Sequence, residues 1–261
     1  MTIVRHEIRL GRIPFLIWTA AIGFMMVICI VMFPEMKGQM AGVSEVFASM
    51  GAFTAAFGMD RLSFGTFLGF YAVECGNILG LGGAFYAALT AASLLSKEEK
   101  DRTAEFLLTH PVRRGRVVLE KLAALVILIT AMNLILYGMA VGTTAAIGET
   151  IPWKEMSLMH LAYYLLQLEL GGIAFGLSAV LRRGSAGVGI GMAVMMYFLN
   201  LLNNISDKAK WLRYITPFAY CEGADIVENV SLDGTLLAVG MALMLAGWAA
   251  AFLIYTKKDI R

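Results

Sequence analysis

The chain has 261 residues, of which 59% are hydrophobic, and its mean hydropathy is +0.74. Because a soluble globular domain contains about 45–50% apolar residues, this composition excludes an ordinary soluble protein and predicts an integral membrane protein. The formal net charge of +2 is small, and we expect no nucleic-acid partner.

Six segments meet the length of about 20 mostly apolar residues that a membrane-spanning helix needs. They are Ile13–Phe33, Gly65–Leu95, Leu119–Ile147, Leu158–Leu181, Ser185–Leu202 and Thr235–Tyr255. The first segment is too long for the apolar core of a signal peptide, and no small-residue cleavage site follows it. The sequence therefore predicts an all-α integral membrane fold with six transmembrane helices in a single transmembrane domain, residues 1–261.

The basic residues set the orientation, because cytoplasmic flanks of membrane spans carry an excess of Lys and Arg. With the N-terminus inside, 15 of the 21 basic residues and both termini lie in the cytoplasm. Ten acidic residues then fall outside. We expect a multi-pass protein of a bacterial plasma membrane with cytoplasmic N- and C-termini.

Residues 1–12, before the first span, contain Arg5, Arg9 and Arg12 at helical spacing, with apolar residues between them. This pattern is typical of a short amphipathic helix that lies on the inner membrane surface. The alternative is an ordinary basic flank that only sets the topology.

Two expected outer segments mix apolar and polar residues. The segment 34–64 is half apolar and is expected to rest at the outer membrane interface. The segment 203–234 contains aromatic residues suited to that interface, and Pro217 predicts a break between two helical pieces. The aromatic residues are Trp211, Tyr214, Phe218 and Tyr220.

The most highly charged segment, residues 96–116, lies between the second and third spans. Ser96 and Glu99 have the spacing of a helix-capping box. The pair His110–Pro111 predicts the end of that helix, because the residue before proline is disfavoured in helical geometry. The segment is therefore predicted to be a cytoplasmic helix, a break and a basic return to the membrane. Taken alone, this pattern fits either an element that docks onto a soluble protein or a solvated connector between two spans.

The sequence EEKDRTAEFLLTHPVRRGRVVLEKL, residues 98–122, resembles the cytoplasmic loop of type-2 ATP-binding-cassette (ABC) permeases. That loop typically shows an acidic residue, Thr, Glu with a run of Leu, Pro-Val-x-Arg, and Gly-Lys. This chain departs from the pattern at Arg102, His110 and Glu120. The segment 211–220, WLRYITPFAY, resembles the family's Pro-Phe-x-Tyr segment before the last span. The resemblance covers essentially the whole chain.

The resemblance implies a coupling helix that sits in a groove of a separate ATPase subunit. It also implies that two permease copies, expected as a homodimer, form the pathway and that two ATPase copies drive it. The residues expected to couple to the ATPase are Lys97, Glu98, Glu99, Asp101, Arg102, Thr103, Glu105, Phe106, Leu107, Leu108, His110 and Pro111.

A nucleotide-binding P-loop requires Gly-Lys followed by Ser or Thr, and no Gly-Lys dipeptide occurs in the chain. We therefore expect no cofactor on this chain, with ATP and Mg²⁺ on the partner ATPase. We expect no catalytic residue and no metal site, because the three histidines and three cysteines lack metal-ligand spacing.

Three polar residues inside the predicted spans are candidates for a substrate pathway: Glu74, Asn133 and Glu169. Charged side chains are costly in the hydrocarbon core and usually face protein or water. Glu74 and Glu169 are either parts of a cation-preferring cavity or hydrogen-bonded packing residues, and Asn133 suits a bond between helices. Gly76, Gly80 and Gly83 predict close helix approach in the second span.

The expected function is an ATP-driven exporter of amphipathic peptides or of drug-like or lipid-like molecules. Two alternatives stay open. One is a non-transporting immunity or sensor protein with the permease fold. The other is an intramembrane protease, suggested by Glu98-Glu99 with Arg102, although the histidines that such an enzyme needs in later spans are absent.

Overall fold

The structure is a computed structural model that describes residues 2–38, 50–97, 113–181 and 186–258. The described residues form helices and no strand. The long helices are α1 (Thr2–Lys37), α5 (Gly76–Ala92), α8 (Arg114–Ala146), α9 (Trp153–Val180), α10 (Ala186–Ile205) and α12 (Gly234–Lys257). The shorter ones are α3 (Ala52–Ala56), α4 (Phe67–Phe70), the π-helix η1 (Tyr71–Cys75), the 3₁₀ helices η2 (Asp207–Tyr214) and η3 (Pro217–Cys221), and α11 (Gly223–Asn229).

Within the described ranges, six helical segments are long and apolar enough to cross a membrane. Each coincides with one predicted span, so the six-span prediction is confirmed. The helices extend beyond most of the apolar segments: α8 begins at Arg114 and α9 at Trp153, several residues before the predicted spans. Hydropathy identifies only the apolar part of such a helix, because charged and interfacial residues continue the same backbone geometry.

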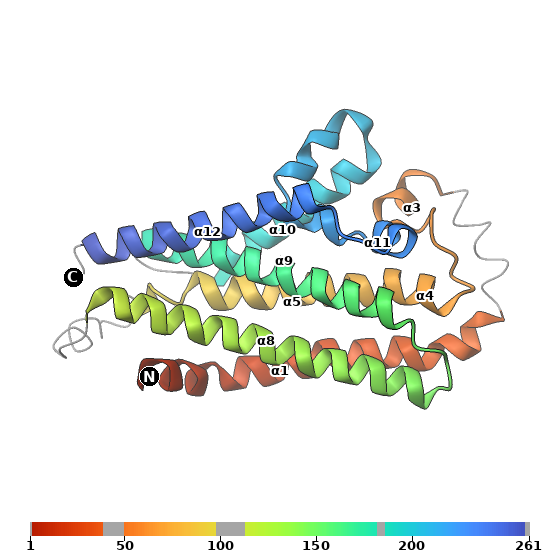
Figure 1. The fold of residues 1–261 in the computed structure, drawn as a ribbon, viewed down its shortest axis with the longest axis horizontal. Coiled ribbons are helices and arrows are strands. Elements are labelled where there is room, and N and C mark those ends of the chain that lie inside the picture. The colour runs from red at the N-terminus through yellow and green to blue at the C-terminus, as the bar shows by residue number, and fades with distance from the viewer. Residues whose placement is uncertain (1, 39–49, 98–112, 182–185, 259–261) are drawn as a thin grey trace.

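The long helices form three layers, with α1 and α8 on one side, α5 and α9 in the centre, and α10 and α12 on the other side (Figure 1). In the most apolar part of α9, 67% of the residues are buried, compared with 17% in α12. The central layer is therefore the core of the bundle. The outer helices keep large apolar side chains exposed, as a lipid environment requires.

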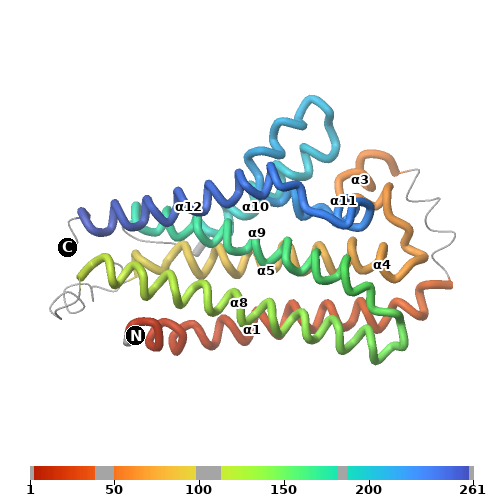
Figure 2. Tube along the Cα trace, in the orientation of Figure 1, coloured from red at the N-terminus to blue at the C-terminus, as the bar shows by residue number. Residues whose placement is uncertain are grey.

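All six long helices run between the same two ends of the bundle (Figure 2). One end, here called the terminal end, carries the N-terminus, the C-terminus and the residues on either side of 98–112. The other end, here called the distal end, carries α3, η2, η3 and α11. The chain therefore returns to the terminal end after every second long helix.

Residues 2–12 are helical, but they do not form a separate helix, because α1 continues through them into the first span. Pro14 and Pro34 both lie inside α1, where each removes one backbone hydrogen bond and crowds the preceding turn without ending the helix. The first turn is held against α8, since the backbone N–H of Ile3 donates to Glu120 Oε2 at 3.1 Å. The Glu120 carboxylate thereby provides an acceptor for a backbone N–H group that has no partner within the first turn of the helix.

The second span is interrupted by the π-helix η1, which lies between α4 and α5. Such insertions are rare and frequently mark functional sites. The Asn77 side chain donates to the carbonyl of Val73 at 2.7 Å, which supports the irregular backbone. The π-helix contains Glu74, one of the predicted pathway residues.

Glycines set the distance between the central helices. A Cβ atom at Gly76 or Gly80 would lie 2.6–3.0 Å from the Tyr163 ring or its hydroxyl, and one at Gly83 would lie 2.0 Å from Gln167 Nε2. The predicted close approach of the second span is therefore confirmed, with α9 as the neighbour. A second close crossing joins α9 and α12, where a Cβ at Gly247 would lie 2.4 Å from the carbonyl oxygen of Gly172.

The distal segment contains helical pieces on both sides of Pro217, as predicted, with η2 before it and η3 and α11 after it. The four aromatic residues divide into two groups. Trp211 and Tyr214 are exposed, whereas Phe218 and Tyr220 are buried against the bundle. The prediction that all four suit the interface is therefore wrong for Phe218 and Tyr220, because η3 folds back between the long helices.

Candidate functional site

Three charged side chains from different elements meet at the terminal end. Glu7 of α1 is 4% exposed, and Lys121 of α8 is fully buried. Lys121 Nζ lies 3.3 Å from Glu7 Oε1 and donates to the carbonyl of Leu94 at 2.6 Å. Lys97, which follows α5, donates to Glu7 Oε2. These residues, Glu7, Lys97 and Lys121, are here called the terminal ion cluster.

The terminal ion cluster lies at the base of the charged segment 96–116. Lys97 is the last described residue before this segment's central part, and Lys121 lies on the second turn of the helix that follows it. A buried ion pair is costly to break, because the remaining charge loses its partner in a medium of low polarity. The cluster therefore fixes the position from which residues 98–112 extend.

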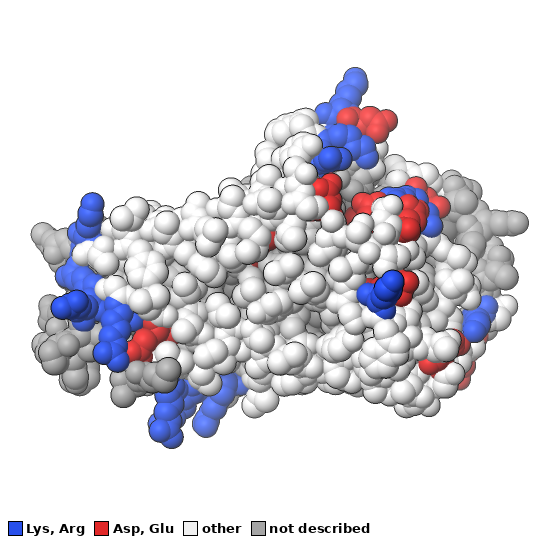
Figure 3. All heavy atoms as spheres, in the orientation of Figure 1, with Lys and Arg blue, Asp and Glu red and all other residues white. Residues whose placement is uncertain are grey.

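Further contacts join the other helices at the terminal end. Arg114 Nη1 donates to the carbonyl of Lys258 at 2.6 Å, and Lys258 Nζ donates to the carbonyl of Leu181 at 3.2 Å. The starts of α1 and α8 are linked through Glu120, which also pairs with Arg116 at 2.9 Å. Basic side chains dominate this end in the view of Figure 3, whereas both signs of charge mix at the distal end.

Of the residues expected to couple to an ATPase, Lys97 is the one that the structure describes. Glu98, Glu99, Asp101, Arg102, Thr103, Glu105, Phe106, Leu107, Leu108, His110 and Pro111 lie outside the described residues. Their role stays a prediction from the resemblance. The sequence did not single out Glu7, although it is the one acidic residue among the basic residues of the N-terminal segment.

The three predicted pathway residues do not meet in one place. Glu74 lies on η1, partly buried and close to Cys29 of α1. Glu169 is fully buried and faces α12, where a Cβ at Gly240 would lie 2.2 Å from its Oε2. The two acidic residues therefore face opposite outer layers of the bundle.

Asn133 forms a buried amide pair with Gln167. Its Nδ2 donates to Gln167 Oε1 at 2.6 Å, and Gln167 Nε2 donates back to Asn133 Oδ1 at 3.4 Å. The pair links α8 to α9, which confirms the predicted hydrogen bond between helices. Gln167 was missed because a single Gln inside an apolar span carries no directional signal.

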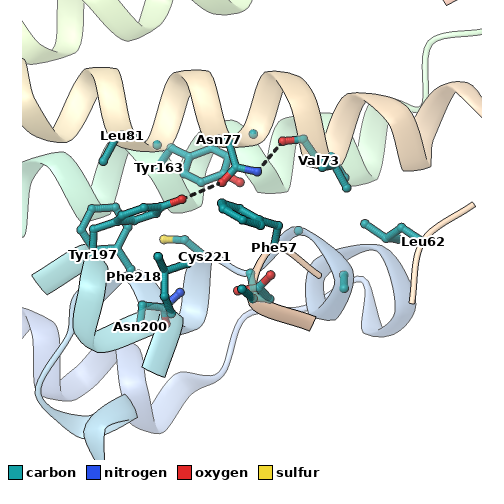
Figure 4. Close-up of a pocket in the computed structure, with 18 residues that line it drawn as sticks. Phe57, Leu62, Val73, Asn77, Leu81, Tyr163, Tyr197, Asn200, Phe218 and Cys221 are labelled. Carbon is teal, nitrogen blue, oxygen red and sulfur yellow. Dashed lines mark hydrogen bonds between the residues drawn. The ribbon is translucent and has the colours of Figure 1, made fainter. Parts of the chain in front are cut away.

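A small cavity of about 40 Å³ lies between η1, α5, α10 and η3 near the distal end (Figure 4). Tyr197 donates to Asn77 Oδ1 at 3.4 Å, and both side chains line the cavity with Tyr163 and Asn200. This volume holds a small number of water molecules. The π-helix η1 thus borders a polar site in an otherwise apolar bundle.

Glu222, between η3 and α11, lines this cavity and a larger one at the distal end. Asn204 Nδ2 donates to Glu222 Oε2 at 2.9 Å. Burial raises the pKa of the Glu222 carboxyl, and Asp225 adds to that effect. The sequence did not identify Glu222, although it stands two residues after the Pro-Phe-x-Tyr segment.

Arg61 holds the segment after α3 against α11. Its Nη1 lies 2.7 Å from Asp225 Oδ1, and its Nη2 pairs with Glu228. The hydrogen bond from Arg61 lowers the pKa of Glu228. Over residues 2–38, 50–97, 113–181 and 186–258, no group of three or more His, Cys, Asp or Glu residues could hold a metal ion.

Comparison with known proteins agrees with this architecture. The model of the ABC-2 family transporter proteins matches residues 1–260. The uncharacterized protein YhcI of Bacillus subtilis (strain 168) is 29% identical over 73% of this chain and 68% of its own length. The family match covers nearly every residue, including all six spans and the charged segment between the second and third. The chain therefore belongs to the ABC-2 family of transporter proteins.

Proposed function

We propose that this chain is the permease subunit of an ATP-driven exporter and that it acts as a homodimer. Two copies of a separate ABC ATPase, which carry ATP and Mg²⁺, bind the charged segment 96–116 of the two permeases. The observation that carries the proposal is the terminal ion cluster, because it anchors the base of this segment to α1 and α8.

The proposed coupling is mechanical. A displacement of residues 98–112 by the ATPase acts on Lys97 and Lys121, which flank this segment and are bound to the same carboxylate. Packed elements transmit such a displacement because close-packed interiors deform little. The starts of α1 and α8 and the end of α5 therefore move together.

The terminal end is assigned to the cytoplasm of a bacterial plasma membrane. Its basic side chains support this orientation by the positive-inside rule. Among the described residues they are Arg5, Arg9, Arg12, Lys97, Arg113, Arg114, Arg116, Lys121, Lys257 and Lys258. The only acidic residues described beside them are Glu7 and Glu120.

The proposed substrates are amphipathic peptides or drug-like or lipid-like molecules. Support comes from two acidic residues in an otherwise apolar bundle: Glu74 on the irregular backbone of η1 and Glu222 beside a polar cavity. Isolated acidic groups in apolar surroundings favour cationic amphipathic compounds over polar neutral ones.

Changing Glu99, Glu105 and Leu108 together to Ala is expected to release the ATPase. These residues belong to the segment that resembles a coupling helix, and interface residues that dock a helix typically contribute more than 1 kcal/mol each at hot spots. The measurement is co-purification of the tagged permease, after gentle solubilisation, with the ABC ATPase that we expect to be encoded beside it.

The matched control for this experiment carries Glu155→Ala, Asp207→Ala and Leu202→Ala, two acidic residues and one Leu at the distal end. It should retain the ATPase as the wild type does. If the folded wild type recovers no ATPase, the coupling proposal fails, and the non-transporting alternative gains support.

Glu74→Gln and Glu169→Gln test the pathway. If these carboxyl groups contact a cationic substrate, each change should lower ATP-dependent uptake of a fluorescent cationic amphipathic peptide into inside-out vesicles by about tenfold, as the loss of a charge-assisted contact predicts. Because Gln has nearly the same volume as Glu, folding should be preserved. Unchanged uptake at normal expression would identify both residues as packing residues.

A further inference from the structure

The larger distal cavity has a volume of about 340 Å³. It lies between the segment after α3, the end of α10, η2, η3 and α11. It opens at the surface, since the exposed residues Asp60 and Lys210 line it. This volume lies at the lower end of the range of about 300–1,000 Å³ that is typical of small-molecule sites.

Glu222 is the residue where this cavity meets the smaller one of Figure 4. The segment after α3 passes directly over its carboxyl group, because a Cβ atom at Gly58 would lie 2.6 Å from Glu222 Oε1. Gly58 has a φ of +66°, in the left-handed region that favours glycine. The close approach leaves the carboxyl group facing the two cavities.

Three asparagines of α10 lie near this carboxyl group: Asn200 lines the smaller cavity with Glu222, and Asn203 and Asn204 line the larger one. Asn204 Nδ2 donates to Glu222 Oε2 and to the carbonyl of Ala56, so the orientation of its amide is fixed. Asn203 Nδ2 then donates to Asn204 Oδ1 at 3.0 Å. As a result, the carbonyl oxygen of Asn203 is directed away from this chain of hydrogen bonds.

Two of these amide oxygens have no donor within the described part of the chain: Asn200 Oδ1 and Asn203 Oδ1. The two residues are only 5% and 8% exposed, and each lines one of the cavities that meet at Glu222. A buried acceptor without a donor is costly, and native proteins usually satisfy it with a ligand or water. The site therefore has unused acceptors beside a carboxyl group.

The basic residues near the cavity do not fill this role. Arg61 is bound to Asp225 and Glu228, and Arg213 donates to the hydroxyl of Tyr214 at 3.3 Å. Among the described residues, no basic side chain forms an ion pair with Glu222. Lys210 also lines the cavity but is exposed, so a ligand that enters the cavity can supply a cationic donor to these oxygens.

We propose that the distal cavity binds an organic cation with N–H donors, a primary ammonium group, at Glu222 and Asn203. The ammonium group donates to the carboxylate and to the amide oxygen of Asn203, and its carbon chain extends past Leu236 and Ala219. Such charge-assisted hydrogen bonds are about twice as strong as neutral ones. This proposal concerns equilibrium binding to the permease alone, so it holds whether or not the cation is transported.

The test compares two cations of the same charge, hexylammonium and hexyltrimethylammonium, on the purified full-length permease in nanodiscs of zwitterionic lipid. Binding is measured by isothermal titration at neutral pH. Hexylammonium should bind about tenfold more tightly, because the trimethyl compound offers no N–H donor. Failure of hexylammonium to bind, or equal binding of both cations, would overturn the proposal.

Variants then locate the site. Glu222→Gln should weaken hexylammonium binding about tenfold, whereas the matched control Asp207→Asn removes an exposed distal carboxylate and should leave it unchanged. If Glu222→Gln does not fold, Asn203→Asp tests the site through a gain of affinity. The added carboxylate should tighten hexylammonium binding about threefold or more. Wild-type affinity in the folded Glu222→Gln or Asn203→Asp variant contradicts the assignment.

Discussion

Glu7→Ala is expected to lower the free energy of unfolding by about 3–5 kcal/mol, because it removes the carboxylate from the terminal ion cluster. Lys121 is fully buried and lies 3.3 Å from Glu7 Oε1, so its ammonium group would lose this counter-charge in a medium that solvates it poorly. The measurement is unfolding in mixed micelles by titration with a denaturing detergent.

Glu35→Ala is the matched control, since Glu35 lies on the same helix but is exposed. A surface change of this kind is expected to alter stability by no more than about 0.5 kcal/mol. Equal effects of the two substitutions would show that Glu7 contributes no more than an exposed residue, and the anchoring role of the cluster would be wrong.

The double variant Glu7→Leu with Lys121→Met separates stability from coupling. Replacement of a buried ion pair by apolar residues is often neutral or stabilising, so most of the stability should return. Lys97 is 25% exposed at its side chain and can reach water. If the ionic contacts transmit motion from the ATPase, the refolded double variant should still transport less substrate than the wild type.

Gly247→Leu is expected to destabilise the bundle by about 3 kcal/mol, the upper end of the usual cost of overpacking. Even the first atom of a side chain at Gly247 would lie 2.4 Å from the carbonyl oxygen of Gly172, and this neighbour is backbone. Helices α9 and α12 would have to separate along their whole crossing. The yield of monodisperse protein and the thermal unfolding temperature measure the effect.

Gly138→Leu on α8 is the control, because no atom lies within 4 Å of a Cβ built at this position. Leu is a better helix former than Gly, so this variant should keep or slightly raise stability. If both Leu variants unfold at the wild-type temperature, α9 and α12 do not cross as closely as the structure shows.

The limits of sequence analysis are clearest at residues 1–12. Three arginines at helical spacing predicted a separate surface helix, whereas α1 runs on from Thr2 to Lys37. Local periodicity identifies a helix but not where it points. The direction depends on Glu120, more than 100 residues away, which accepts from the backbone of Ile3 at the start of α1.

The candidate site likewise combines residues that sequence analysis identified with residues that it missed. Lys97 and the segment after it were identified by their similarity to a family pattern, but their buried partner Glu7 was not. Glu74, Asn133 and Glu169 were correctly located inside spans, yet only Asn133 forms the predicted bond between helices. Glu222 was missed because its significance comes from asparagines on α10 and from Gly58, which are distant in sequence.

The sequence by itself determined that the protein is a six-span helical membrane protein, which segments span, and that Gly76, Gly80 and Gly83 permit close helix approach. Length, hydropathy and residue size act locally, so they can be read without a fold. Only the tertiary structure decided the course of α1, the terminal ion cluster, the opposite orientations of Glu74 and Glu169, and the cavities at Glu222. These features arise from contacts between helices, and the energy of a buried charge or acceptor depends on which distant groups surround it.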